Sequence, residues 1–251
     1  MTRTQVFSGV TYQCEKALDS GSVGLIHFFT IDLNTSGLEL YVTPLDHDAA
    51  QAGWQYQTCW APSIIDEQNL SILVNGTLYD TERSISLLPG DWARSIETVI
   101  AEHQVSHIDQ QSYLLWFEDD LTPHLEKSKP PSQSACARAR WGISGQGVLI
   151  DNGIVSKHGT MLLDRRTAIG INGKTKQLFI AVFDLASGAA AGQFLVERGV
   201  TDAIMLDGGD STFLALGKDA QRLTPRTLVF PSRPLATVFG VRAPELNRKN
   251  R

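Results

Sequence analysis

The sequence predicts an α+β fold, a single domain built on a mixed, largely antiparallel sheet with helices packed on it. The chain has 251 residues, of which 42% are apolar, enough to bury one large core. Short runs of β-branched and aromatic residues recur along its whole length, and turn residues separate most of them. Few helical segments join these runs, which favours this sheet over a regular doubly wound fold.

Strands dominate the start of the chain. Residues 25–33 and 38–42 are rich in β-formers, and the polar, glycine-containing stretch 34–37 between them predicts a hairpin. Residues 71–76 form a short apolar run that stops at an Asn-Gly dipeptide, a pair that tolerates positive φ and commonly ends strands.

A surface helix is predicted after Pro89-Gly90. Asp91 is a residue type that caps helix N-termini. The apolar residues that follow recur on one helical face, namely Trp92, Ile96, Val99 and Ile100.

One loop is expected inside the domain rather than at its boundary. After the strand 113–117, residues 118–134 are polar and contain three prolines, which predicts a loop. We expect residues 1–251 to form one domain, with a looser N-terminal half, 1–117, and a motif-bearing C-terminal half, 135–245.

The second half carries a denser pattern. Its expected elements are strands at 147–153, 167–171, 178–184 and 236–242, a short helix around 189–198, and two strands within 203–216.

Charge and hydropathy exclude several classes of protein. Lys and Arg total 22 against 27 Asp and Glu, so a net charge of -5 argues against nucleic acid as a partner. No run approaches the roughly 18 apolar residues of a spanning helix, so no membrane span is expected. The chain is expected to be cytoplasmic if Met1 is its natural start, and periplasmic or secreted if an export signal was trimmed. The oligomeric state stays open.

Familiar metal, redox and nucleotide motifs are missing. The six histidines form no HExxH or HxH spacing, and the three cysteines lie far apart, so we expect no metal site and no cofactor. No GxSxG, GxxxxGK[ST] or GxGxxG motif occurs between a strand and a helix, which removes serine hydrolases, nucleoside triphosphatases and dehydrogenases as leading candidates.

The most specific motif lies at 207–212, directly after an apolar strand and before another. Adjacent glycines let a ligand approach the backbone, and their amides form an anion-binding concavity when they point together. The stretch offers two carboxylates, two glycine amides and two hydroxyls, from Asp207, Asp210, Gly208, Gly209, Ser211 and Thr212. Such a stretch is also typical of a tight hairpin turn, and the residues alone leave both interpretations open.

Arginines at strand ends give a second group of candidates. Arg165 and Arg166 precede the strand 167–171, and arginine binds phosphate or carboxylate through a planar fork. In an extended segment the two side chains point to opposite faces, so one of them can simply contact solvent without binding a ligand. Arg233 and the Asn-Gly dipeptide at 75–76 are more often parts of turns.

Taken together, these blocks resemble the phosphodiester glycosidase domain family. The matching blocks are RRTAIGI, LFIAVFD, IMLDGGDSTFLAL and RPLATVFGV, in the family's order and spacing, and the resemblance covers residues 147–242 well. The first half fits more loosely. The chain departs from the family pattern where Asp210 replaces a third glycine, where Leu185 follows Asp184 in place of glycine, and where the connection 188–199 is short.

The resemblance implies a glycosidase that hydrolyses a sugar-1-phosphodiester, or a related glycoside, at the anomeric carbon. The best-known activity in the family removes N-acetylglucosamine from a phosphodiester. The leaving group is a phosphate monoester with a second pKa of about 6, so its oxygen needs little protonation. Such a site needs cations and amide donors at the phosphate and a carboxylate beside the anomeric carbon.

The resemblance also assigns roles. We expect Asp207 to be nucleophile or general base, Arg166 and Arg233 to bind phosphate, and Asp210 to serve as a second carboxylate. Asp184 is expected to hold a sugar hydroxyl or orient Asp207. The other substrate contacts are expected from Asn75, Gly76, Gly208, Gly209, Ser211 and Thr212. The expected partner is a carbohydrate or sugar phosphate.

Two other functions stay open. The changed glycine at Asp210 and the short 188–199 connection are compatible with a non-catalytic carbohydrate-binding or envelope-associated module. A polysaccharide glycoside hydrolase is the third reading, and it predicts turnover of non-phosphorylated substrates together with a need for Asp210.

Overall fold

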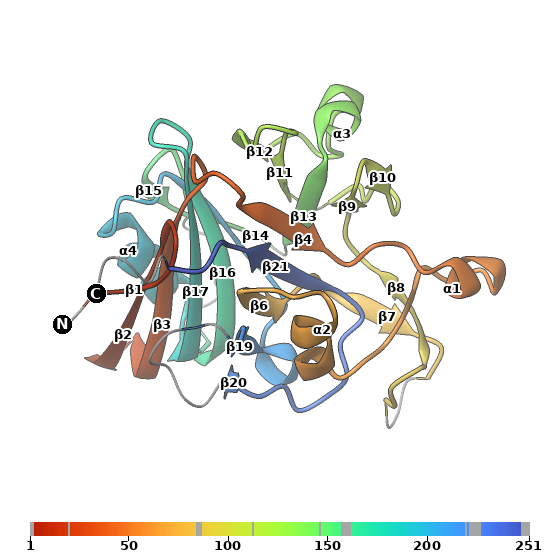
Figure 1. Ribbon diagram of the computed structural model, residues 1–251, viewed down its shortest axis with the longest axis horizontal. Helices are drawn as coiled ribbons and strands as arrows, with labels where there is room; N and C mark the ends of the chain where they lie inside the picture. Colours follow the sequence, from red (N-terminus) through yellow and green to blue (C-terminus); the bar gives the residue numbers. More distant parts are fainter. Residues whose placement is uncertain are drawn as a thin grey trace.

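The computed structural model describes residues 3–19, 21–83, 87–111, 113–145, 147–156, 162–218, 220 and 227–246. Within these ranges the chain forms four β-sheets, all of whose strand pairs are antiparallel, and four short α-helices (Figure 1). The largely antiparallel character and the packed helices are therefore confirmed, whereas the expectation of one sheet is wrong. Several small sheets share the core because most strands are short.

The largest sheet has eight strands and both of its faces are buried. Its strands in spatial order are β1 (Thr4–Phe7), β2 (Val10–Asp19), β3 (Ser22–Asp32), β17 (Gln177–Ala186), β16 (Asp164–Asn172), β18 (Asp202–Met205), β14 (Gly147–Asp151) and β15 (Ile154–Val155). In β17, Ile180 and Val182 face the main core, while Ala181 and Phe183 face a second apolar layer. Burial on both sides explains why residues 178–183 of β17 form an uninterrupted apolar run.

Two five-stranded sheets pack on the main-core face of the large sheet. One consists of β20 (Thr227–Val229), β19 (Leu214–Leu216), β6 (Ile72–Asn75), β21 (Val238–Arg242) and β4 (Glu39–Val42). The other consists of β10 (Gln104–Val105), β9 (Val99–Ala101), β13 (Trp141–Gly145), β11 (Tyr113–Phe117) and β12 (Pro123–Glu126). A three-stranded sheet of β5 (Tyr56–Gln57), β8 (Trp92–Ser95) and β7 (Tyr79–Thr81) extends the fold beside β6 (Figure 1).

The described helices are α1 (His47–Gln51), α2 (Ala61–Glu67), α3 (Gln133–Arg138) and α4 (Gly188–Val196). Three of these four helices, α2, α3 and α4, pack their apolar residues into the clusters of buried residues on the sheets, whereas α1 buries only Ala49. Helix α4 covers the second face of the large sheet, and the Ser187 hydroxyl caps it by accepting a hydrogen bond from the amide of Ala190. This element confirms the helix expected around 189–198.

The expected hairpin at 25–42 is wrong, although both of its strands form. Strand β3 pairs with β2 and β17, whereas β4 pairs with β21 in another sheet. Leu33 and Leu38, which flank the turn, are both buried in the main core. The turn therefore carries the chain across the core from one sheet to the other.

The helix predicted after Asp91 is also wrong. Residues 92–101 form β8 and β9, separated by a turn at 96–98. In β8 burial alternates with a period of two, Ala93 and Ser95 lying inside and Arg94 outside. The apolar residues fitted a helical spacing only because two short strands follow each other across this turn.

The segment 118–134 is not a plain loop. Strand β12 pairs with β11, and Pro123 opens this edge strand, a position that proline tolerates. Helix α3 begins just beyond Ser132, whose hydroxyl accepts a hydrogen bond from the amide of Ala135. The expected strands at 71–76, 113–117 and throughout the second half are confirmed in position.

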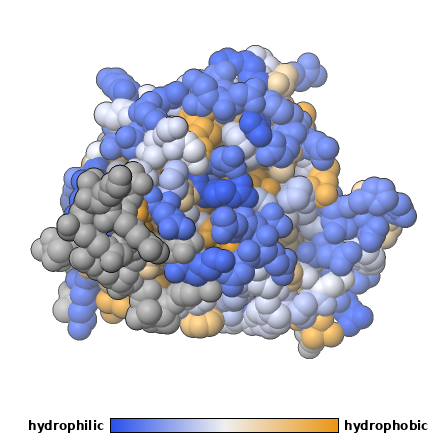
Figure 2. All heavy atoms as spheres, in the orientation of Figure 1, coloured by the Kyte–Doolittle hydropathy of each residue, from blue (hydrophilic) through white to orange (hydrophobic). Residues whose placement is uncertain are grey.

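The molecular surface in the orientation of Figure 2 is mostly hydrophilic, with small scattered apolar areas. Scattered apolar residues are ordinary on a protein surface. No described helix is long and apolar enough to cross a membrane. Cys14, Cys59 and Cys136 are free thiols.

Candidate active site

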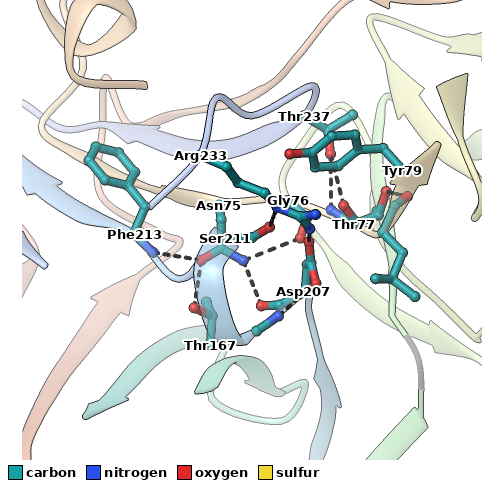
Figure 3. Close-up of polar contacts among 12 residues, drawn as sticks. Asn75, Gly76, Thr77, Tyr79, Thr167, Asp207, Ser211, Phe213, Arg233 and Thr237 are labelled. Carbon is teal, nitrogen blue, oxygen red and sulfur yellow. Dashed lines mark hydrogen bonds and ion pairs between the residues drawn. The ribbon is translucent and has the colours of Figure 1, made fainter. Parts of the chain in front are cut away.

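Asp207 lies where the eight-stranded sheet meets the sheet that contains β6. It follows β18 by two residues, and its amide donates to the carbonyl of Gly76, just beyond the end of β6, at 3.1 Å. The side chain of Asn75, the last residue of β6, donates through Nδ2 to the carbonyl of Asp207 at 2.7 Å (Figure 3). The ends of two strands from different sheets are thus joined at this residue.

Asn75 is 1% exposed and its amide group links three segments. Its Oδ1 accepts from the hydroxyl of Thr167 in β16 at 2.6 Å and from the amide of Phe213 at 3.1 Å. Asn75 of the predicted Asn-Gly pair therefore links the end of β6 by hydrogen bonds to the three other segments. A direct contact from Asn75 to a sugar stays a prediction.

The carboxyl group of Asp207 is almost fully enclosed, with the residue 4% exposed. Its Oδ1 accepts from the amide of Gly208 at 2.8 Å, and its Oδ2 accepts from Nη2 of Arg233 at 2.9 Å. Burial raises the pKa of Asp207, while hydrogen bonding to Ser211, the charge of Arg233 and the Gly208 amide lower it. Each oxygen of this desolvated carboxylate therefore accepts a hydrogen bond, Oδ1 from the Gly208 amide and Oδ2 from Arg233.

Arg233 connects this carboxylate to the molecular surface. Its Nε donates to the hydroxyl of Ser211 at 2.7 Å, and its side chain is 38% exposed. The guanidinium carbon lies 4.8 Å from the ring centre of Tyr79, a cation–π distance. Burial raises the pKa of Tyr79 to about 12, so its phenol stays protonated and donates to the carbonyl of Pro234. Arg233 is therefore in contact with both Asp207 and Ser211, and its role in binding phosphate stays a prediction.

The two glycines after Asp207 permit close backbone packing. A Cβ on Gly208 would lie 2.7 Å from the carbonyl oxygen of Arg165, and Gly209 has φ +56°, in the left-handed region. A 3₁₀ turn at Gly209–Ser211 follows, and both Ser211 and Thr212 are fully buried. The stretch is therefore a turn, and this turn presents Asp207.

The adjacent arginines lie on either side of this turn. Arg166 is 9% exposed and donates to the carbonyls of Ala186 and Leu162. Its Nη1 lies 3.6 Å from the position that a Cβ on Gly208 would take. Arg165 donates instead to the carbonyls of Thr212 and Phe230. The structure thus brings Arg166 beside the glycine backbone, while Arg233 is the arginine that pairs with Asp207.

The other two predicted carboxylates lie apart from this cluster of contacts. Asp184 accepts from the amide of Leu25 through Oδ2 at 2.7 Å, across the β3–β17 pair. Asp210 is exposed, and its carbonyl accepts from the amide of Ser232. Gly76, by contrast, is closely packed, since a Cβ there would lie 2.7 Å from the backbone of Thr237. The roles assigned to Asp184 and Asp210 stay predictions.

Comparison with known proteins now bears on this arrangement. A family model described as phosphodiester glycosidase matches residues 68–242, which include Asn75, Asp207 and Arg233. The chain belongs to the phosphodiester glycosidase family. A match of this extent confirms the family resemblance of the sequence.

Solved structures share the fold of this phosphodiester glycosidase family member. The zebrafish N-acetylglucosamine-1-phosphodiester alpha-N-acetylglucosaminidase catalytic domain, auto-inhibited by its pro-peptide, is 15% identical with a TM-score of 0.64, over 95% of this chain and 84% of that one. A hypothetical protein from Synechocystis is 13% identical with a TM-score of 0.61, over 93% of this chain and 62% of that one. No curated protein matches the chain. At these identities the likeness shows the fold.

Sequence reasoning missed one acidic residue of this phosphodiester glycosidase domain, Glu97. It lies in the turn between β8 and β9, is 4% exposed, and accepts from the amide of Leu78 through Oε2 at 3.3 Å. The pKa of Glu97 is raised to about 8, mainly by burial; the Leu78 amide lowers it, and the charges of Asp207 and Asp109 add smaller increases. A lone glutamate between two apolar segments was the available signal, and the surface helix predicted over this stretch gave no reason to expect it to be buried.

Nothing in the described part of the chain groups three or more His, Cys, Asp or Glu side chains in a way that suits a metal ion. The donors that surround Asp207 are an arginine, backbone amides and hydroxyls. Donors of this kind suit an anionic or hydroxylated ligand.

Proposed function

We propose that this protein hydrolyses a sugar-1-phosphodiester at its anomeric carbon, with Asp207 as nucleophile or general base. One observation carries the proposal: a buried carboxylate, fixed by an arginine and a glycine amide, lies directly after a core strand inside the family match. A carboxylate beside the anomeric carbon is what glycoside cleavage requires.

Arg233 is suited to the charge of the phosphate. A guanidinium has five N–H donors, of which one contacts Ser211 and another Asp207, and more than a third of the side chain is exposed. A phosphate that approaches from the exposed side meets this cation while Asp207 lies behind it. The chain carries a net charge of -5, so local arginine has to offset the long-range repulsion of an anionic substrate.

Arg166 and the neighbouring turn support the same chemistry from the other side. Its guanidinium lies beside the backbone of Gly208, and Gly209 and Asp210 follow in the turn. We assign Arg166 to the phosphate, as the sequence motif implies, with Ser211 and Thr212 beside it. Asn75 and Gly76 hold the backbone that presents Asp207.

The sugar is assigned by likeness alone. The zebrafish relative is named for N-acetylglucosamine-1-phosphodiester, so N-acetylglucosamine 1-(methyl phosphate) is the natural first probe. Asp210 stands where the family motif has glycine, so a panel of other sugar-1-phosphodiesters belongs beside it.

The test is release of free sugar from this probe by the purified chain. We expect turnover by the wild type and none by Asp207→Asn, and strong loss in Arg166→Ala, with both variants folded by circular dichroism. Glycan binding without turnover would favour a carbohydrate-binding module. Turnover confined to non-phosphorylated glycosides and lost in Asp210→Asn would favour a polysaccharide glycoside hydrolase. Wild-type rates in Asp207→Asn would overturn the assignment.

A further inference from the structure

Glu97 is attached to the same short segment of chain that holds Asp207. The carbonyl of Gly76 accepts from the amide of Asp207, and two residues later the amide of Leu78 donates to Oε2 of Glu97. Segment 76–78 therefore hydrogen-bonds to the backbone of Asp207 at one end and to the side chain of Glu97 at the other. Both residues are 4% exposed, and the charge of Asp207 acts on the pKa of Glu97, so the two buried carboxyl groups interact electrostatically.

The turn that carries Glu97 is fixed by hydroxyl groups. The hydroxyls of Thr77 and Ser95 lie 2.9 Å apart, and Ser95 also donates to the carbonyl of Glu97. The amide of Ile96 donates to the carbonyl of Leu78 at 2.9 Å. These bonds tie the turn 96–98 to segment 76–78, so the position of Glu97 relative to Asp207 is set by the fold.

The two carboxyl groups have opposite electrostatic surroundings. Asp207 has a cation, Arg233, at 2.9 Å. For Glu97, the charges of two carboxylates, Asp207 and Asp109, instead add to the rise in its pKa that burial causes. Nε2 of His107 lies 3.2 Å from the carbonyl oxygen of Ile96, the residue before Glu97, within hydrogen-bonding distance. At neutral pH Asp207 is therefore favoured as the ionised member and Glu97 as the protonated one, the arrangement that separates a base or nucleophile from an acid.

We propose that Glu97 is the proton-donating partner of Asp207, and that the site therefore also hydrolyses glycosides whose leaving group is an alcohol. This inference rests on the proposed function, and it extends the substrate class beyond phosphodiesters. A phosphate monoester can leave as an anion, whereas an alcohol leaves readily only when its oxygen takes up a proton. A positioned acid therefore matters for an ordinary glycosidic bond and not for the phosphodiester.

The proton and electron balance of the step is simple. As the C1–O bond breaks, its electron pair stays on the leaving oxygen, which takes the proton of Glu97 and departs as an alcohol. Water supplies the hydroxyl that ends on C1, and the remaining proton of that water returns to the carboxyl pair. The pair begins and ends each cycle with one proton.

The first test needs no substrate. Carboxyl NMR of protein labelled with ¹³C-glutamate gives the titration of Glu97, assigned by its loss in Glu97→Gln. We expect a pKa near the value of about 8 in the wild type and a clear fall in Asp207→Asn, because a like charge is removed. A titration at the ordinary glutamate pKa, or no change in Asp207→Asn, overturns the pairing.

The second test compares two leaving groups on one sugar, N-acetylglucosamine 1-(methyl phosphate) and methyl N-acetyl-α-glucosaminide. Glu97→Gln keeps an oxygen for the amide of Leu78, so we expect it to fold. We expect it to slow the methyl glycoside by about 10²- to 10⁴-fold and the phosphodiester by less than about 10-fold. Glu102→Gln, which changes an exposed glutamate paired with Arg140, is the matched control and should leave both rates unchanged.

The outcomes separate the two proposals. If the wild type cleaves neither compound, the proposed function fails and the proton-donor role fails with it, while the titration still decides the pairing. If it cleaves the phosphodiester alone, or if Glu97→Gln slows both substrates equally, the proposed function stands and the proton-donor role is overturned.

Discussion

The side-chain amide of Asn75 holds the backbone of Asp207, with Nδ2 2.7 Å from the carbonyl oxygen of a residue 132 positions away. The same amide group accepts from Thr167 and Phe213 through its oxygen. One buried side chain thus fixes the segment that carries the proposed reacting carboxylate. Nδ2 also donates to the carbonyl of Gly76 at 3.4 Å, so all four hydrogen-bonding positions of the amide serve the fold, and through the fold they serve the site.

Replacement of Asn75 by alanine should therefore destabilise the protein strongly. Three buried groups lose a partner, and each unsatisfied buried group costs about 1–3 kcal/mol. We expect the free energy of unfolding, measured by urea denaturation, to fall by about 3 kcal/mol or more. Asn34→Ala, at an exposed turn, is the control and should change it by less than about 0.5 kcal/mol. Equal stability of the two variants would show that the hydrogen bonds of Asn75 do not stabilise the fold.

The sequence predicted elements well where the cause is local. Strand β17 was evident because eight of its ten residues are apolar, whereas the glycines after β18 left both a tight turn and an anion-binding loop open. Pairing was not predictable in this way. Strand β4 follows β3 closely, yet it pairs with β21 near the other end of the chain, since the turn between them crosses the core.

The site was predicted in part for the same reason. Asp207 and Arg233 were recognised from motifs, but the ion pair between them depends on a turn whose packing no local pattern describes. Glu97 was missed because residues 92–101 match a helical period as well as two strands. Only the fold buries this glutamate and links it to the backbone of Asp207 through segment 76–78.

Loss of Arg233 should alter both the rate and its pH dependence. In Arg233→Met the carboxylate of Asp207 stays buried without its cation, so its pKa rises further and the acid limb of the rate–pH profile moves to higher pH. We expect a loss of about 10²- to 10³-fold in kcat/KM for the phosphodiester probe, the size seen when a preorganised electrostatic donor is removed.

Two companion variants sharpen this prediction. Arg233→Lys keeps the charge but not the fork that reaches Ser211 and Asp207 together, so an intermediate loss is expected. Arg138→Met removes a surface arginine that pairs with Glu118 and should leave the profile unchanged. An acid limb that stays in place in Arg233→Met would contradict the pairing as a control of Asp207.

Gly208 should tolerate no side chain. A Cβ there meets the carbonyl oxygen of Arg165 at 2.7 Å, so Gly208→Ala has to move the turn that presents Asp207. We expect a stability loss of about 1–3 kcal/mol in thermal unfolding and a larger proportional loss of turnover. Gly147→Ala is the matched control, because nothing lies within 4 Å of its added Cβ and its stability should be unchanged or slightly higher. Equal behaviour of both variants would rule out close packing as the reason for glycine at 208.

Glu97 should make the stability of the protein fall as the pH rises. Below the ordinary glutamate pKa of 4.5 both the folded and the unfolded chain carry the proton, and between 4.5 and about 8 only the folded chain keeps it. The folded state then binds more protons than the unfolded one, so the free energy of unfolding declines by up to about 1.4 kcal/mol per pH unit until Glu97 ionises.

Glu97→Gln removes this dependence and leaves the smaller contribution of Asp207, whose raised pKa acts with the same sign. Urea denaturation from pH 5 to pH 9 should therefore show the variant gaining stability relative to the wild type by a few kcal/mol, with the difference levelling off above about pH 8. Glu102→Gln should run parallel to the wild type, because its carboxylate is exposed and paired with Arg140. A difference between Glu97→Gln and wild type that does not change with pH would mean that Glu97 is ionised in the folded protein, and the proton it is proposed to donate would be absent.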